Sequence, residues 1–212
     1  MDLRVTVDIV IFTVRDEALQ VLLVKRGVPP FQGQYAIPGG FTHEEESLED
    51  AALRELYEET GVRDVFLEQL YTFGDPRRDP RGRIITVAYY ALIASDKLSV
   101  TAGADAAEAK WFSLEKLPAL AFDHCRVLAY ALERLQNKLE YTTVGFQLLQ
   151  EKFTLSELQV VYEAILGKRM DKRNFRRKIR QLGILKPLRE WRRTGRKPAQ
   201  LFRFAARRIA DL

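Results

Sequence analysis

The chain has 212 residues, of which 47% are hydrophobic and 30% charged, with only 12 glycines and 8 prolines. This composition excludes a disordered or low-complexity protein and leaves enough apolar residues for a sizeable core. No apolar run reaches the length of a membrane span, and acidic residues interrupt the N-terminal apolar stretch, so we expect neither membrane insertion nor secretion. The single cysteine, Cys125, has no partner for a disulfide, and a reducing, cytoplasmic location is expected.

The charges are divided unevenly along the chain. Residues 1–140 contain 16 Lys and Arg against 23 Asp and Glu, a net charge of −7, whereas residues 141–212 contain 18 against 6, a net charge of +12. Such an asymmetry suggests two separate roles, with a polyanion as a candidate partner of the basic segment. The alternative is a basic tail that is only solvated. We therefore predict two domains, 1–140 and 141–212.

Strand-like and helix-like stretches alternate in the first domain. Four strands, rich in β-branched and aliphatic residues, are predicted over residues 5–14, 19–24, 65–73 and 84–93. The first two form a hairpin around the polar Arg15-Asp16-Glu17. A helix is predicted from about Ser47 to Thr60, with Gly61 as its left-handed C-cap. The result is a mixed α/β domain wound around one sheet.

The second domain follows a linker helix. Residues 123–138 have apolar side chains at the spacing of an amphipathic helix, which is predicted to join the two domains. Two helices and a two-stranded ribbon are then predicted, over about 155–166, 172–182, 184–188 and 200–204. Thr154 and Glu157 match a capping box at the first helix, and Asp171 can cap the second. Helix, turn, helix and ribbon in this order are typical of a winged helix.

The predicted helix at 47–60 carries the carboxylates of Glu55, Glu58 and Glu59 within about 100° of arc, at ~100° per residue. Like charges this close are tolerated when a hard divalent cation lies among them, and carboxylate oxygens suit Mg²⁺ or Mn²⁺. A metal held in this way bridges phosphate oxygens, neutralises charge on a leaving group and activates a water. The alternative for a short glutamate cluster is a solvated acidic helix face.

Around this helix the chain resembles the Nudix box. The pattern is Gly40, five residues, Glu46, seven residues, Arg54-Glu55, aliphatic Leu56, one residue, Glu58-Glu59, one residue, Gly61 and aliphatic Val62. It departs from the box at no position, and so many fixed spacings are far more specific than a lone glycine loop. The resemblance implies an α/β/α Nudix sandwich over about residues 1–140, and hydrolysis of a nucleoside diphosphate linked to another group.

The resemblance also implies roles for individual residues. The metal ligands, for Mg²⁺ or Mn²⁺, would be Glu55, Glu58 and Glu59, directly or through water, with a backbone carbonyl from the region of Gly40. Arg54 would hold the acids in place by pairing with Glu46 or Glu55. The general base stays open, because Nudix enzymes take it from different places; the candidates are Glu55, Glu108 and Asp105.

The loop at 75–83 is rich in arginine. Its four guanidinium groups are candidates to pair with diphosphate oxygens, and two aromatic residues are candidates to stack on a base. The proposed ligand-binding residues are Arg77, Arg78, Arg81, Arg83, Tyr35 and Phe31. The alternative is a solvated surface loop that binds no ligand. The stretch RDPRGR, followed by residues 84–90, resembles Nudix proteins that handle ADP-ribose, and this resemblance implies the ligand class.

The second predicted helix of the basic domain separates two kinds of side chain. Its cationic residues fall within one arc of about 140°, and Phe175, Ile179 and Leu182 fall within another of about 60°. The apolar stripe would dock the helix on its own domain and leave a cationic face for a DNA groove. A cationic face that is only solvated is the alternative. The DNA-binding candidates are Lys172, Arg173, Asn174, Arg176, Arg177, Arg180, Arg193, Arg196 and Lys197.

A second resemblance covers the linker and the basic domain. FDHCRVLAYALERLQNKLEYTT, FTLSELQVVYEAILGKRMDKRNFRRKIRQLGIL and RKPAQLFRF resemble the Nudix-related transcriptional regulators of NAD metabolism, the NrtR family. The resemblance implies a homodimeric repressor of NAD-metabolism genes on a palindromic double-stranded DNA operator. ADP-ribose or a related nucleotide would bind the Nudix domain as effector and release the DNA.

Two alternative functions remain. Many such regulators are said to have eroded boxes, whereas this box is intact, so an active Mg²⁺-dependent pyrophosphohydrolase acting on ADP-ribose-type substrates is the main alternative. A third interpretation, an RNA-end-processing Nudix enzyme, lacks an identifiable aromatic stacking platform.

Overall fold

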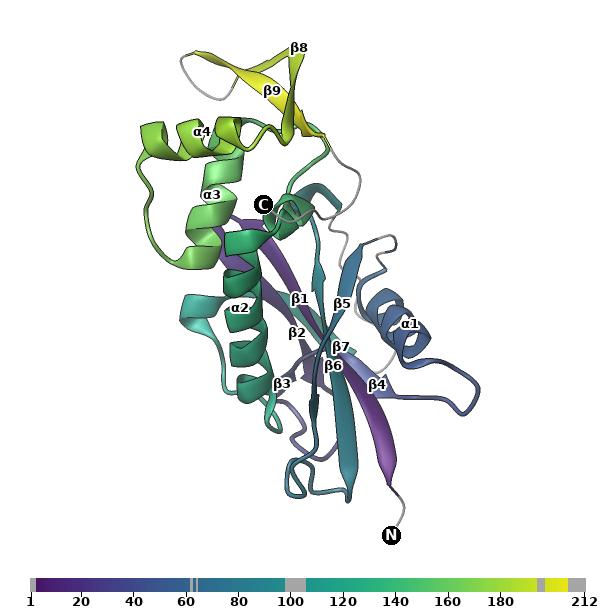
Figure 1. Cartoon of the computed structure of the whole chain (residues 1–212). Helices are drawn as coiled ribbons and strands as arrows, with labels where there is room; N and C mark the ends of the chain where they lie inside the picture. Colours follow the sequence, from purple (N-terminus) through teal and green to yellow (C-terminus); the bar gives the residue numbers. More distant parts are fainter. Residues whose placement is uncertain (1–2, 62, 64, 98–105, 194–196, 206–212) are drawn as a thin grey trace.

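The structure is a computed structural model of the chain, and it describes residues 3–61, 63, 65–97, 106–193 and 197–205. A sheet with helices on both sides forms one half, and two helices with a two-stranded ribbon form the other (Figure 1). Both halves agree with the architecture predicted from the sequence.

The larger sheet is built around its first strand. Its strands are β1 (Arg4–Arg15), β2 (Ala18–Arg26), β3 (Tyr35–Ala36), β4 (Gly39–Phe41), β5 (Phe66–Phe73), β6 (Ile84–Leu92) and β7 (Ala106–Ser113). Their order is β3-β2-β1-β6-β5, while β4 pairs with β1 and β7 with β2. The predicted β1–β2 hairpin is confirmed, and Asp16 and Glu17 have positive φ values of 50° and 59°, as a tight hairpin turn requires. β1 also runs parallel to β6, from Arg4 beside Ile84 to Phe12 beside Leu92.

Helices cover both faces of this sheet, which is why β1 is buried from Val7 to Phe12. On one face, Ile9 and Ile11 pack with Leu56 of α1 (Leu48–Thr60). On the other, Val10 and Phe12 belong to the apolar cluster that contains the buried side of α2 (His124–Tyr141). The predicted α/β/α sandwich is therefore present. Short 3₁₀ turns occur at η1 (Ser95–Lys97), η2 (Leu114–Lys116) and η3 (Val144–Leu148).

The predicted order of elements in the basic segment is also confirmed. It consists of α3 (Leu155–Leu166), α4 (Lys172–Gln181), β8 (Leu185–Arg193) and β9 (Pro198–Phe204). Thr154 and Glu157 form the predicted capping box, and the Asp171 side chain accepts a hydrogen bond from the Asn174 backbone N–H. β8 is longer than predicted, because it pairs with β9 as far as Arg193, which lies beside Pro198.

The two halves share one apolar cluster. Leu135 and Leu139 of α2 belong to the same buried cluster as Leu158 and Val161 of α3. The Gln136 side-chain amide adds a hydrogen bond of 2.9 Å to the Ile165 carbonyl. The linker helix is thus packed against the winged helix, and the domain boundary at residue 140 stays a prediction. Within the described parts of the chain, no helix has both the length and the apolar character to cross a membrane.

Candidate functional site

A polar cavity of about 640 Å³ lies between α1, β4, the loop after β5 and the start of α2. This volume is within the range of small-molecule sites. Cationic, acidic and aromatic side chains line it together. They include Arg26, Phe41, Arg54, Glu55, Glu58, Glu59, Arg78, Asp79, Arg81, Phe122 and His124.

The three glutamates of the box line this one cavity, but they differ in exposure. Glu55 is buried and receives a hydrogen bond of 2.7 Å from Arg54 Nη1, whereas the Glu58 side chain is 54% exposed. Burial raises the pKa of Glu55, although its bond with Arg54 acts in the opposite direction. Among the described residues, no three His, Cys, Asp or Glu side chains are grouped as a metal site in this conformation. Their role as metal ligands therefore remains a prediction.

Arg54 holds the acids of the box in place. Its Nε and Nη2 donate to the two Glu46 oxygens at 3.0 and 2.7 Å, and its Nη1 donates to Glu55. The sequence predicts pairing with one or the other glutamate, and the structure has both. The bonds from Arg54 and from the His43 backbone lower the pKa of Glu46 to about 2. Arg54 thus fixes Glu55 at the edge of the cavity.

Position 40 requires a glycine for a steric reason. It lies in β4 opposite Val7, and a Cβ atom placed on it would overlap with the Glu55 carboxylate. Because glycine has no side chain, the Glu55 carboxylate can lie next to the Gly40 backbone in β4.

The loop at 75–83 divides its arginines between two environments. Arg78 and Arg81 line the cavity, whereas Arg77 is exposed outside it and Arg83 donates to the Gly74 carbonyl at 2.6 Å. Arg81 forms a two-bonded ion pair with Asp79, and its guanidinium lies 5.2 Å from the Phe41 ring centroid and 5.4 Å from that of Phe122. Only two of the four arginines are thus placed to contact a ligand in the cavity.

The aromatic residues of the cavity are not those predicted. Tyr35 packs its ring on Phe112 and donates to Glu108 Oε2 at 3.2 Å, and neither Tyr35 nor Glu108 lines the cavity. Phe31 does not line the cavity, but its exposed ring is in edge contact with Phe122, which does. Phe41 and Phe122 are the aromatic rings that line it among the described residues. Three residues named from the sequence lie outside the described residues. They are the candidate base Asp105, the candidate DNA contact Arg196, and Val62 of the Nudix box.

Asp8 and His124 line the cavity without having been singled out from the sequence. His124 is buried, and its Nδ1 accepts the Ile37 backbone N–H at 2.9 Å while its Nε2 lies 3.8 Å from Asp8 Oδ2. Burial lowers the pKa of His124 and favours the neutral ring. The sequence did contain a signal for this part of the cavity: Asp8 lies within an apolar strand, and a carboxylate there is rarely buried without a specific role.

A second candidate surface is the cationic face of α4. Phe175 and Ile179 are buried, and the Phe175 ring is in edge contact with Tyr162 of α3, with centroids 5.4 Å apart. The cationic and polar residues on the other side are exposed, and they are Lys172, Arg173, Asn174, Arg177 and Arg180. Arg176 differs, since it is half-buried and donates to Ser156 Oγ at 3.1 Å. The predicted separation of faces is therefore present, with Arg176 partly turned toward α3.

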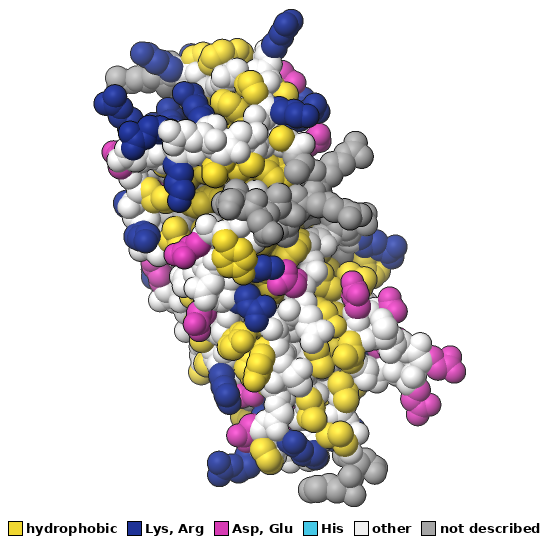
Figure 2. Space-filling model, viewed as in Figure 1, with side chains coloured by type: hydrophobic (Ala, Val, Ile, Leu, Met, Phe, Trp, Pro, Cys, Tyr) yellow, Lys and Arg dark blue, Asp and Glu magenta, His cyan; other side chains and the backbone are white. Residues whose placement is uncertain are grey.

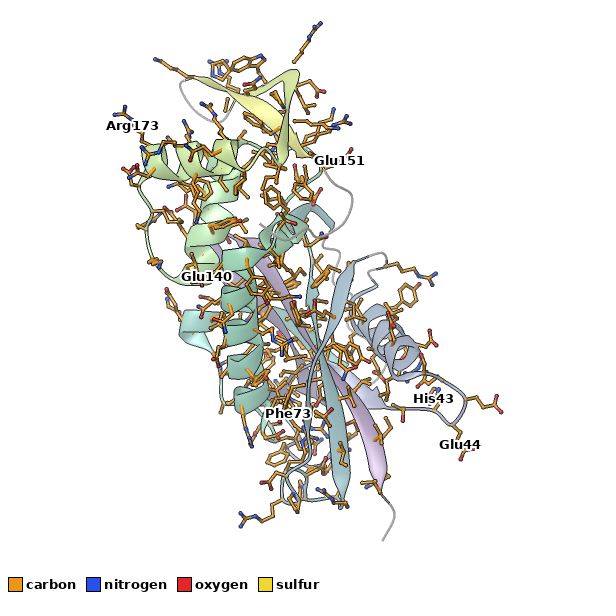
Figure 3. All side chains as sticks on the ribbon, in the orientation of Figure 1. His43, Glu44, Phe73, Glu140, Glu151 and Arg173 are labelled. Atoms are coloured by element: carbon orange, nitrogen blue, oxygen red, sulfur yellow. The ribbon has the colours of Figure 1, made fainter. Side chains whose placement is uncertain are left out.

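The basic surface extends from α4 to the ribbon. Figure 2 shows Lys and Arg side chains gathered over this end of the molecule. The labelled Arg173 points away from the protein body, at the far end from the acidic loop that carries Glu44 (Figure 3). Arg193 and Lys197, beside the tip of the ribbon, are both exposed. The two candidate sites thus lie in different halves of the chain.

Comparisons with known proteins match both halves. A family model described as the NUDIX domain matches residues 2–134, and one described as the NrtR DNA-binding winged helix domain matches residues 145–204. The chain is 40% identical over 204 residues to an ADPR responsive transcriptional repressor of Acinetobacter baylyi, covering 94% of this chain and 81% of that protein. It is also 41% identical over 109 residues to an ADP-ribose pyrophosphatase of Methanocaldococcus jannaschii, covering 51% and 63%.

Solved structures resemble the chain as a whole. Shewanella oneidensis NrtR, complexed with a 27mer DNA, is 42% identical with a TM-score of 0.83, covering 94% of this chain and 93% of that one. The NUDIX domain of that protein, complexed with ADP ribose, is 42% identical with a TM-score of 0.58, covering 64% and 90%.

Proposed function

Because this chain belongs to the NrtR family of Nudix-related transcriptional regulators, we propose that it is a repressor that binds operator DNA and is controlled by ADP-ribose. The observation that carries this proposal is the presence, in one chain, of a nucleotide-sized polar cavity and an exposed cationic helix on a winged helix. A location in the cytoplasm, where bacterial genes are transcribed, follows from this function.

The DNA partner is assigned to the basic half. The relative from Shewanella oneidensis was solved with a 27mer DNA. In this chain, α4 would enter the major groove and present Arg173 and Arg177, while Arg193 and Lys197 would contact the backbone from the ribbon. We propose a homodimer on a palindromic operator, because a two-fold symmetric protein reads two half-sites with equal helices.

The effector is assigned to the cavity of the Nudix half. Arg78 and Arg81 would donate hydrogen bonds to a diphosphate, and Phe122 and Phe41, whose rings Arg81 contacts in this structure, would lie beside a base or sugar. The ligand would thus lie between the acidic residues of α1 and the aromatic end of the cavity. Arg77, Arg83, Tyr35 and Phe31 are not part of this proposal, because none of them lines the cavity.

Nudix hydrolase domains generally use divalent metal ions. We propose Mg²⁺, or Mn²⁺, held by Glu55, Glu58 and Glu59 with the Gly40 carbonyl. The residues fit such an ion, since they offer hard oxygen donors and the missing side chain of Gly40 leaves Glu55 room beside the backbone. When bound, the ion would neutralise charge on phosphate oxygens. Arg54 would keep the glutamates oriented, and the buried His124 and Asp8 would close the floor of the cavity.

A binding experiment tests the repressor function. A duplex is selected from a random 27-base-pair pool with the full chain and labelled, and its affinity is measured by fluorescence anisotropy at low salt. Counterion release favours association most under these conditions. We expect ADP-ribose to release the duplex, and AMP at the same concentration to have a weaker effect. A chain that enriches no duplex at low salt is not a DNA-binding repressor.

Hydrolysis is a second candidate function, favoured by the intact box and by the similarity to the archaeal ADP-ribose pyrophosphatase. Of the described candidate bases, Glu55 lines the cavity and Glu108 does not, so Glu55 is the base we propose. The test is AMP release from ADP-ribose with Mg²⁺, with Glu58→Gln as the matched control. AMP release that is equal in the two proteins comes from a contaminant and rules out this activity.

A further inference from the structure

A buried ion pair connects the floor of the cavity to the start of the linker helix. Arg78 lines the cavity although its side chain is only 3% exposed. Its Nη2 lies 2.7 Å from Asp123 Oδ1, and its Nε donates to Asp123 Oδ2 at 3.1 Å. A second carboxylate, of Asp8, lies 3.3 Å from the same Nη2. Arg78 is therefore a cationic group that contacts both the cavity and the residue at the start of α2.

Asp123 occupies the N-cap position of α2 without capping it. Its side chain makes no capping hydrogen bond, and its backbone, with φ −93° and ψ 20°, is not extended. Ser47, Thr154 and Asp171, in the equivalent positions of α1, α3 and α4, each accept a backbone N–H. Aspartate is among the best capping residues, so the Arg78 guanidinium is holding a carboxylate that has a second favourable position nearby.

The other end of α2 lies in the winged-helix half. Leu139 shares a buried cluster with Leu158, and Gln136 donates to the Ile165 carbonyl of α3. α4 in turn packs on α3 through Phe175. A change at the start of α2 therefore has a continuous path of packed groups to the cationic helix.

We propose that Arg78 and Asp123 are the positioning pair that couples the effector cavity to DNA binding. An anionic group of the ligand takes over the donors of Arg78, and the released Asp123 carboxylate turns to cap α2 at the backbone N–H of Cys125, since the Arg126 N–H already donates to the Asp123 carbonyl at 2.9 Å. The pair thus has two arrangements, and the ligand favours the second because only there are the Arg78 donors available to it. This inference rests on the proposed function, because it concerns the regulation of the same cavity.

Two substitutions at one position separate this coupling from a merely structural role. Asparagine in Asp123→Asn can still cap α2 but pairs weakly with Arg78, so we expect weaker operator binding without ligand and no further release by ADP-ribose. Alanine in Asp123→Ala cannot cap, so we expect operator binding close to that of the unmodified chain, again without release. Glu133→Gln removes an exposed carboxylate from the middle of α2 and serves as the control. ADP-ribose should weaken operator binding by about 5–150-fold in the unmodified chain and in this control.

Cys125 gives an independent readout at the start of α2. It is the single cysteine of the chain, it is exposed, and it lies in the first turn of the helix. A carboxylate that turns toward the first turn brings negative charge close to the Cys125 sulfur and repels an anionic disulfide reagent. We expect saturating ADP-ribose to slow disulfide exchange of Cys125 with an anionic aromatic disulfide reagent by about twofold or more. The same addition should leave the rate of Asp123→Ala unchanged.

The outcomes separate the two levels of the proposal. If the unmodified chain releases its operator with ADP-ribose and Asp123→Asn releases it equally well, the inference is wrong and the proposed function stands. If both Asp123 variants lose operator binding to the same degree, the residue is only structural and the inference is also wrong. A chain that binds no duplex overturns the proposed function together with the inference. Should a variant fail to fold, an unchanged Cys125 rate in the unmodified chain with ADP-ribose overturns the coupling.

Discussion

The carboxylate of Glu55 lies directly against the backbone of Gly40, in the space that a side chain at position 40 would occupy. This contact joins α1 to β4 and places the most buried glutamate of the box at the edge of the cavity.

Replacing Gly40 by alanine should therefore displace Glu55. The added methyl group overlaps with a carboxylate that Arg54 also holds, so we expect a loss of stability of about 1–3 kcal/mol. Any ADP-ribose hydrolysis should fall at least about tenfold, which corresponds to 1.4 kcal/mol in the barrier. Thermal unfolding and AMP release measure the two effects. Gly74→Ala is the control, because the nearest atom to its added methyl group is 3.7 Å away. Equal behaviour of the two variants would contradict the packing role of Gly40.

The ion pair between Glu46 and Arg54 predicts how stability depends on pH. The pKa of Glu46 is lowered from 4.5 to about 2, so the carboxylate stabilises the folded chain fully above pH 4.5 and loses this effect as the pH falls toward 2. We expect the unfolding midpoint of the unmodified chain to fall more steeply over this interval than that of Glu46→Gln. Glu45→Gln, which removes an exposed neighbouring carboxylate, should keep the steep slope. Parallel curves for the unmodified chain and Glu46→Gln would show that the pair does not contribute.

Arg173 and Arg180, near opposite ends of α4, should affect DNA binding differently. The N-terminal part of a recognition helix contacts base edges, so we expect Arg173→Ala to reduce discrimination between the selected duplex and a single-base variant by about 1–3 kcal/mol. Arg180→Ala should lower affinity for all duplexes and reduce the slope of log K against log salt by about 0.9, as the loss of one phosphate contact requires. Lys110→Ala on β7 is the control. Identical effects of Arg173→Ala and Arg180→Ala on every duplex would refute this assignment.

Phe175 should be essential for the stability of the winged helix. It is buried against Tyr162, and its removal leaves a cavity between α3 and α4, so we expect Phe175→Ala to cost about 3–5 kcal/mol. Denaturant unfolding followed by circular dichroism gives this value. Tyr57→Ala, which removes an exposed ring from α1, should have a much smaller effect. A change below 1 kcal/mol for Phe175→Ala would mean that α4 is held in place by other contacts.

The parts of the chain that follow local rules were predictable from the sequence. The helix at Leu48–Thr60 has its cap at Ser47 and its left-handed end at Gly61, because both signals lie within one turn of the helix they limit. The pairing of Arg54 with Glu46 was expected from the resemblance to the Nudix box, and the structure has it. The apolar and cationic arcs of α4 depend only on helical periodicity.

The rest depends on contacts between distant segments. Arg78 and Asp123 are 45 residues apart, and nothing near either residue indicates that they meet. Phe122 lines the cavity because the chain turns sharply before α2, with a positive φ of 53°, whereas Tyr35 lies in a strand and is directed toward β7. Arg176 is on the cationic arc, but the approach of Ser156 from α3 draws it inward. Tertiary packing determined each of these differences.

The parallel pairing of β1 with β6 also has a consequence for biosynthesis. The central strand of the Nudix half finds its neighbour 80 residues later, so it emerges from the ribosome long before residues 84–92 exist to cover its edge. The ribbon, by contrast, is formed by β8 and β9, which follow one another in the chain, and such local contacts form quickly. Nascent chains of this protein are therefore expected to need protection of an apolar N-terminal hairpin during translation, while the C-terminal ribbon can form soon after its release.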